Sequence, residues 1–186
     1  MHRFTNRPAC SGFLQQELGL DGTSLPDWLL EVFTEHAKDV PKRDQPANSL
    51  NLQLASWVVR DQDLDVFRAV RETFMGFASG HFAFSGLGEA ALSGIVFGVL
   101  GLVRRAQQAG ASVSPLQARI LMILRSSRRQ PLAVDAIDVG LRLGGLSLSQ
   151  GEIRDALQQL TEVPTLQGPQ AFVQKLSNGA WMTTGV

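Results

Sequence analysis

The sequence predicts a mainly α-helical protein with one small β-hairpin near its C-terminus. Most of the 186 residues fall in runs whose apolar side chains recur at steps of three and four, the spacing of a helix with one buried face. Near the end of the chain, Asn178-Gly179 separates two strand-like runs, 171–176 and 180–184. Both residues tolerate positive φ, so we expect a type I′ hairpin turn there.

The N-terminal part, residues 1–109, is expected to be a bundle of about four helices. Candidate helices cover 12–20, 28–40, 49–59 and 61–78, and the last has the most regular apolar spacing. Pro41 and Pro46 are expected to end the second helix and begin an exposed link.

Residues 86–103 form the most apolar stretch and leave two interpretations open. Ala90, Gly94 and Gly98 recur at steps of four, which lets a second helix approach closely. The stretch is borderline in length for a membrane span, which needs about 20 apolar residues. We favour a central helix buried by its neighbours, and keep a membrane anchor as the alternative.

From residue 110 onward the residues that begin and end helices are easier to identify. Ser114 can cap a helix whose first residue is Pro115. A short extended piece at 130–134 and a second helix at 135–143 follow, the latter ended by two glycines. Ser149 and Glu152 then match a capping box, which predicts a third helix reaching residue 162.

Helix, short strand, helix, capped helix and hairpin, in this order, resemble the winged helix-turn-helix family over about residues 114–186. The resemblance places the third helix at the recognition-helix position and residues 177–179 at the tip of the wing. The connection at 144–148 is longer than the family's usual tight turn. We therefore expect two domains, a helical bundle at 1–109 and a winged helix at 110–186.

The resemblance implies contact with a macromolecule. The charges on the third helix and the hairpin help to decide between DNA and protein. In a DNA-binding mode Arg154 could read guanine, Gln158 adenine, and Lys175 could touch phosphate. The third helix also carries three outward carboxylates, which phosphates would repel. The candidate macromolecule-binding residues are Arg125, Arg128, Arg129, Arg142, Gln150, Arg154, Gln158 and Lys175.

Overall charge gives no support to a polyanionic partner. The chain has 17 Lys and Arg against 17 Asp and Glu, and residues 110–186 carry seven basic and five acidic side chains. Strong nonspecific nucleic-acid binders usually show a larger excess of positive charge. The single cysteine, Cys10, allows no intrachain disulfide, which fits a reducing, cytoplasmic location.

No set of residues predicts catalysis, a metal site or a cofactor. His2, His36 and His81 are scattered. Residues 86–91 resemble a dinucleotide-binding turn but lack the flanking βαβ unit, so those glycines are interpreted as helix packing. Cys10 is expected to be an inert thiol.

We therefore expect a non-enzymatic protein that works through protein interaction, as an assembly subunit or a homodimer. Trp28, Trp57 and the 86–103 helix are candidates for the association surface. The alternative is a DNA-binding transcriptional regulator whose N-terminal bundle dimerises or senses a ligand. A membrane-anchored protein is the second alternative.

Overall fold

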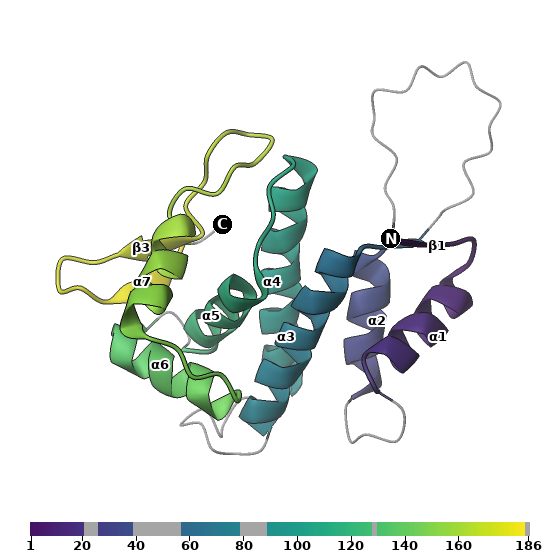
Figure 1. Cartoon of the computed structure of the whole chain (residues 1–186), viewed down its shortest axis with the longest axis horizontal. Helices are drawn as coiled ribbons and strands as arrows, with labels where there is room; N and C mark the ends of the chain where they lie inside the picture. Colours follow the sequence, from purple (N-terminus) through teal and green to yellow (C-terminus); the bar gives the residue numbers. More distant parts are fainter. Residues whose placement is uncertain (21–25, 39–56, 79–88, 128–129, 185–186) are drawn as a thin grey trace. The chain divides into compact units, whose positions relative to one another are not determined.

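The computed structural model describes residues 1–20, 26–38, 57–78, 89–127 and 130–184. Its described part is mainly α-helical, with seven helices and two two-stranded antiparallel sheets, so the predicted fold class is confirmed (Figure 1). The chain divides into two compact units, unit 1 at Met1–Phe67 and unit 2 at Arg68–Val186. The expected domain boundary at residue 109 falls inside unit 2 and stays a prediction.

Unit 1 combines helices with a small sheet. Its elements are β1 (His2–Phe4), α1 (Arg7–Glu17), α2 (Asp27–His36), β2 (Trp57–Val59) and the first turns of α3 (Asp61–Ala78). Helix α1 begins earlier than the predicted residue 12, because the Asn6 side chain accepts a hydrogen bond from the Ala9 amide and caps it. Pro8 is tolerated because it lies in the first turn.

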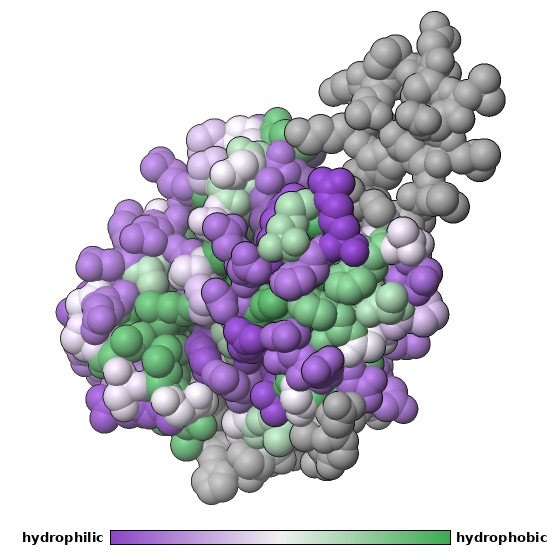
Figure 2. Space-filling model, turned by 45° about the vertical axis from the view of Figure 1, so that its right-hand side comes forward, coloured by the Kyte–Doolittle hydropathy of each residue, from purple (hydrophilic) through white to green (hydrophobic). Residues whose placement is uncertain are grey.

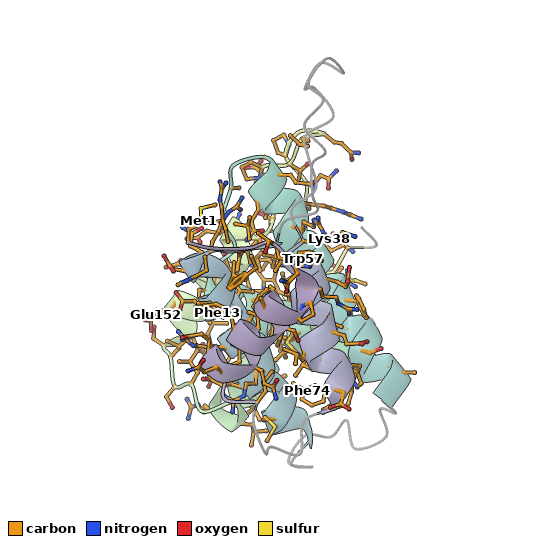
Figure 3. All side chains as sticks on the ribbon, turned by 90° about the vertical axis from the view of Figure 1, so that its right-hand side faces the viewer. Met1, Phe13, Lys38, Trp57, Phe74 and Glu152 are labelled. Carbon is orange, nitrogen blue, oxygen red and sulfur yellow. The ribbon has the colours of Figure 1, made fainter. Side chains whose placement is uncertain are left out.

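Strand β2 corrects the prediction of a helix over 49–59. Residues 57–59 pair antiparallel with β1, placing His2 opposite Val59, while residues 49–56 lie outside the described residues. Val58 and Val59 are β-branched, and such side chains favour a strand once a partner strand is present. Lys38 forms an isolated bridge with Trp57, and Figure 3 shows these two residues next to each other.

Buried aromatic and aliphatic side chains hold unit 1 together. The rings of Phe33 on α2 and Phe67 on α3 stack with centroids 4.6 Å apart. Cys10 and Leu14 on α1 are fully buried. Trp28 and Trp57, expected on an association surface, are half-buried.

Unit 2 contains the rest of α3 and the C-terminal elements. These are α4 (Glu89–Gln108), α5 (Pro115–Ser126), α6 (Val134–Leu143), α7 (Gln150–Gln159), β3 (Val173–Lys175) and β4 (Trp181–Thr183). Leu132, in the predicted extended piece, forms a β-bridge with Trp181 on the side of β4 away from β3. This order of helices with a small hairpin is compatible with a winged helix.

Helix α5 is the most completely buried helix of unit 2. Seven of its side chains are at most 1% exposed: Ala118, Ile120, Leu121, Met122, Ile123, Leu124 and Ser126. It packs against α4, α6, α7 and β4. Since buried side chains occur around most of this helix, α5 takes the central position expected of the 86–103 helix.

Helix α4 buries one face only. Val96, Val99 and Val103 lie in the core, whereas Gly94 is exposed and Phe97 is 55% exposed. By length and composition, residues 90–108 are the one stretch in the described helices that could cross a membrane.

Glycines let neighbouring elements approach in unit 2. The guanidinium of Arg125 on α5 lies over Gly98 of α4, in the space a Cβ would occupy. On α3, a Cβ at Gly76 would lie 3.3 Å from the Leu143 carbonyl oxygen at the end of α6. Helix α6 ends as predicted at its glycine pair, with Gly145 at φ +78° and a Leu146 amide to Leu141 carbonyl bond of 2.9 Å.

The hairpin loop differs from the predicted two-residue turn. Leu176 and Ala180 close the loop through a 2.8 Å bond from the Leu176 amide to the Ala180 carbonyl. Three residues therefore lie between them, and Gly179 takes φ +82°. This is the longer glycine-bulge loop, which places the positive φ at its last residue.

Arg119 ties three helices of unit 2 together. From α5, its guanidinium donates 3.1 Å to the carbonyl oxygen of Gly144 at the end of α6 and pairs with the Glu72 carboxylate of α3. The side chain is only 12% exposed, so water can replace few of these contacts.

We predict that Arg119→Ala lowers the free energy of unfolding by about 2 kcal/mol, because the Gly144 carbonyl and the half-exposed Glu72 carboxylate both lose the charged donor that this mostly buried side chain supplies. The matched control is Arg142→Ala, which removes a 61% exposed side chain from its ion pair with Asp138 and should cost less, at most about 1 kcal/mol. Urea unfolding followed by circular dichroism measures both variants. Equal losses would contradict a structural role for Arg119.

We also predict that Cys10 resists thiol reagents in the folded chain. Burial raises the pKa of the Cys10 thiol to about 11, so little thiolate exists at pH 8. Labelling with a disulfide reagent at pH 8 should be slow in native buffer and fast in denaturant. Rapid labelling of the native chain would show that the thiol is accessible.

Candidate functional site

A groove of about 540 Å³ opens between α7, the start of α6 and the hairpin. Nine side chains and backbone segments line it: Val134, Asp135, Gln150, Arg154, Asp155, Gln158, Lys175, Gly179 and Trp181. We call it the α7–hairpin groove. Its volume lies within the range of roughly 300–1,000 Å³ of sites that bury a small ligand.

Helix α7 supplies one wall of the groove. Gln150, Arg154 and Gln158 follow one another at steps of four, so they lie along one stripe of the helix. The predicted capping box fixes where α7 begins: the Ser149 hydroxyl accepts 3.3 Å from the Glu152 amide, and the Glu152 carboxylate accepts 2.9 Å from the Ser149 amide. The Ser149 hydroxyl also donates to the Glu152 carboxylate at 2.7 Å, and this bond, together with the bond from the Ser149 amide, lowers the pKa of Glu152.

Gln150 links α7 to α6 across the groove. Its Nε2 donates to the carboxylate of Asp135, which lies in the first turn of α6. Its Oε1 accepts a 2.9 Å bond from the Arg154 guanidinium one turn further along α7. The Gln150 amide therefore fixes the positions of the Asp135 carboxylate and the Arg154 guanidinium, one on each side of it.

The hairpin supplies the other wall and the floor. In its register, Val173, Lys175, Trp181 and Thr183 lie on the same side, and all but Lys175 are buried. The ammonium of Lys175 lies 5.8 Å from the ring centroid of Trp181, within cation–π range. Lys175 thus lies on the core-facing side of the hairpin, but beyond the core, where it lines the groove.

The charges of the groove are mixed. Arg154 and Lys175 are cationic, and Asp135 and Asp155 are anionic. In the described part of the chain neither cation forms an ion pair, and both are exposed. The arrangement can hold a ligand that carries charged groups of both signs.

The structure brings together half of the predicted binding residues. Gln150, Arg154, Gln158 and Lys175 all line the groove. Arg142 pairs with Asp138 one turn away, at 2.9 Å.

The first arginine of the cluster predicted at the end of α5 does not lie on an exposed patch. Arg125 is half-buried against Gly98. Arg128 and Arg129 lie outside the described residues. An arginine at a helix end looks exposed in the sequence, and nothing near Arg125 signals that a glycine on α4 receives it.

Sequence reasoning missed Trp181, Val134, Asp135 and Asp155 as groove residues. Trp181 lies in the second of the two predicted strand-like runs, and its alternation with Thr183 gives the signal that it faces inward. Asp135 was treated as a helix-start residue. Its position in the first turn of α6 is correct, but its contact with Gln150 depends on the packing of α6 against α7.

Other candidate sites are sparse. No group of three or more His, Cys, Asp or Glu able to hold a metal occurs among the described residues. His2 lies 3.8 Å from Asp61, and the ring of His36 packs edge-on against Phe67. His81 and the glycines at 86 and 88 lie outside the described residues. Figure 2 shows hydrophobic residues in separate patches among hydrophilic ones on the face drawn.

Comparison with known proteins gives no relative: no family model, no curated protein and no solved structure matches the chain. The functional argument therefore rests on the geometry of the groove.

We predict that Ser149→Ala lowers the free energy of unfolding by about 1 kcal/mol, because the α7 amide at Glu152 loses its acceptor. Ser147→Ala, an exposed serine just before the cap, is the matched control and should have little effect.

The cost of Ser149→Ala should also depend on pH. Because the folded pKa of Glu152 is lowered, the carboxylate stabilises the chain above its ordinary pKa of 4.5 and loses this effect as the pH falls below it. The difference between wild type and Ser149→Ala in urea unfolding should therefore narrow toward pH 3. A difference independent of pH would contradict the role of the carboxylate.

Proposed function

We propose that this protein is a non-enzymatic, cytoplasmic interaction subunit that uses a C-terminal winged helix to dock a protein. The observation that carries this proposal is the α7–hairpin groove, which lies beside the buried Trp181 and is lined by side chains of both charges and by amides. Protein surfaces present apolar and charged groups of both signs together, so such a groove suits them.

The winged-helix assignment is supported by the pairing within unit 2. Leu132 before α6 bridges to β4, and β4 pairs with β3, so the short strand before the second helix joins the hairpin. Helix α7 then occupies the position of a recognition helix, beside the hairpin.

Duplex DNA suits this groove less well. A recognition surface for DNA meets phosphates on both sides of the groove it enters, and phosphate neutralisation supplies much of the affinity. Here Asp135 and Asp155 stand beside Arg154 and Lys175. Two carboxylates would face the same phosphates as the two cations, and their repulsion would offset the attraction.

The DNA-binding regulator is the second candidate. It is favoured by one observation, that Arg154 and Gln158 are both exposed on one stripe of α7. These are the residue types that hydrogen-bond guanine and adenine in the major groove.

Fluorescence anisotropy with a labelled mixed-sequence duplex separates the two candidates. We expect no salt-sensitive rise in anisotropy at protein concentrations up to about 50 µM in low salt. A DNA-binding protein would be detected in this range, because such proteins bind nonspecific duplex with Kd values of roughly 1–100 µM even at physiological salt. Binding that Arg154→Ala weakens and added salt abolishes would instead establish the regulator.

Photo-crosslinking tests docking directly. A benzophenone amino acid at position 158 lies in the groove, and the same substitution at Gln174, exposed on the opposite side of the hairpin, is the matched control. In cells that make the protein we expect position 158 to yield a specific protein adduct that position 174 does not. An adduct twice the size of the 20.2 kDa chain would identify a homodimer. Equal labelling at both positions would contradict docking in the groove.

A further inference from the structure

Helix α6 carries an apolar stripe on its exposed side. Val139 is 55% exposed and Leu143 is 38% exposed, and Ala136 is exposed as well. These residues follow one another at steps of three and four, so they lie along one side of the helix. In the described part of the chain, α6 is the one helix that exposes two large apolar side chains. Single exposed apolar residues are ordinary, whereas a stripe of them along a helix is typical of contact with a further element.

Opposite charges border this stripe on one side. Asp135 and Arg142 lie seven residues apart, and 3.6 residues per turn bring residues at this spacing to nearly the same side of a helix. Seen along the helix from Val139, both charges lie about 50° to one side, and Ala136 and Leu143 lie about 50° to the other. Asp135 is exposed, and the Arg142 side chain is 61% exposed.

A second copy of α6, packed antiparallel with Val139 on a two-fold axis, matches this stripe in charge and in size. Such an axis reverses the direction of the helix but keeps the two sides of the stripe facing their equivalents, and each contact is made twice. Asp135 and Arg142 lie about 6 Å and 4.5 Å from the axis along the helix, in opposite directions. Asp135 therefore faces Arg142 of the second copy. On the other side, the small Ala136 faces the larger Leu143 of the second copy.

Both charged groups have bonding capacity left for this contact. The Arg142 guanidinium donates to the Asp138 carboxylate at 3.1 Å and 2.9 Å, which holds it on the surface of α6. These bonds use two of its five N–H donors. The Asp135 carboxylate accepts from Gln150 Nε2, and a carboxylate can accept about four bonds. Neither existing contact has to break when a second copy binds.

We infer that this protein forms a two-fold symmetric dimer through α6, with Val139 on the axis and reciprocal Asp135–Arg142 ion pairs beside it. The ten residues of α6 span about 15 Å, so the interface is small and the dimer is weak. This dimer goes beyond the proposed docking function, because the α7–hairpin groove can bind a partner in a monomer or in a dimer.

Sedimentation equilibrium of the full chain between about 1 µM and 1 mM tests this inference. The mass of the wild-type chain should rise from 20.2 kDa toward twice that value. Val139→Asp should weaken dimerisation about tenfold or more, because two carboxylates would meet at the axis. Phe97→Asp is the matched control, since Phe97 on α4 is also 55% exposed, and this variant should dimerise as wild type.

Exchanged charges test the antiparallel pairing itself. Asp135→Lys and Arg142→Glu should each weaken self-association about tenfold, because like charges would face each other in both ion pairs. An equimolar mixture of these two variants should form a heterodimer, because opposite charges then face each other at both positions. A chain that carries both substitutions should dimerise again for the same reason.

Circular dichroism checks that these surface variants are folded. A wild-type chain that stays at 20.2 kDa over the whole range would overturn the dimer. Loss of dimerisation in Phe97→Asp but not in Val139→Asp, or a mixture of the charge variants that does not associate, would overturn the α6 interface. A crosslink from position 158 to a different protein would support groove docking whatever the result for the dimer.

Discussion

A helix buried on every side has no polar face to turn to water, and unit 2 is built around one. The buried Gln117 of α5 and the buried Ser127 at its C-cap need hydrogen-bond partners inside the protein. Gln117 meets this need by accepting from the Ser114 amide and donating to Gln159 of α7, and Ser127 donates to the Leu124 carbonyl. A buried polar group without such partners would cost about 1–3 kcal/mol, so these bonds decide how α7 can approach α5.

The position of the groove follows from that constraint. Helix α7 is held against α5, and the hairpin is held by the paired bonds between Leu132 and Trp181, each 2.8 Å long. These bonds join the segment before α6 to the hairpin. They therefore fix the start of α6 next to Trp181, which lines the groove. Gln150 then joins the two helices at the rim. The groove is thus formed by contacts within the fold itself.

Local signals in the sequence predicted local structure well. The Ser149 cap, the start of α5 at Pro115 and the end of α6 at Gly145 all depend on residues within one or two turns of each other. The strand at 57–59 escaped prediction because its partner, β1, lies more than 50 residues earlier. Only four of the nine residues that line the groove were predicted to bind, for the same reason: Trp181 comes to line it through contacts that no short window of sequence contains.

The contact between Gly98 and Arg125 also limits how this sequence can diverge. A side chain at position 98 requires the guanidinium to leave its place on α4, whereas a shorter residue at 125 frees that place. The two positions, on different helices, are therefore expected to covary among descendants of this chain. A descendant that replaced Gly98 first would turn the Arg125 guanidinium out to solvent. Its surface would then become more basic without any new charge.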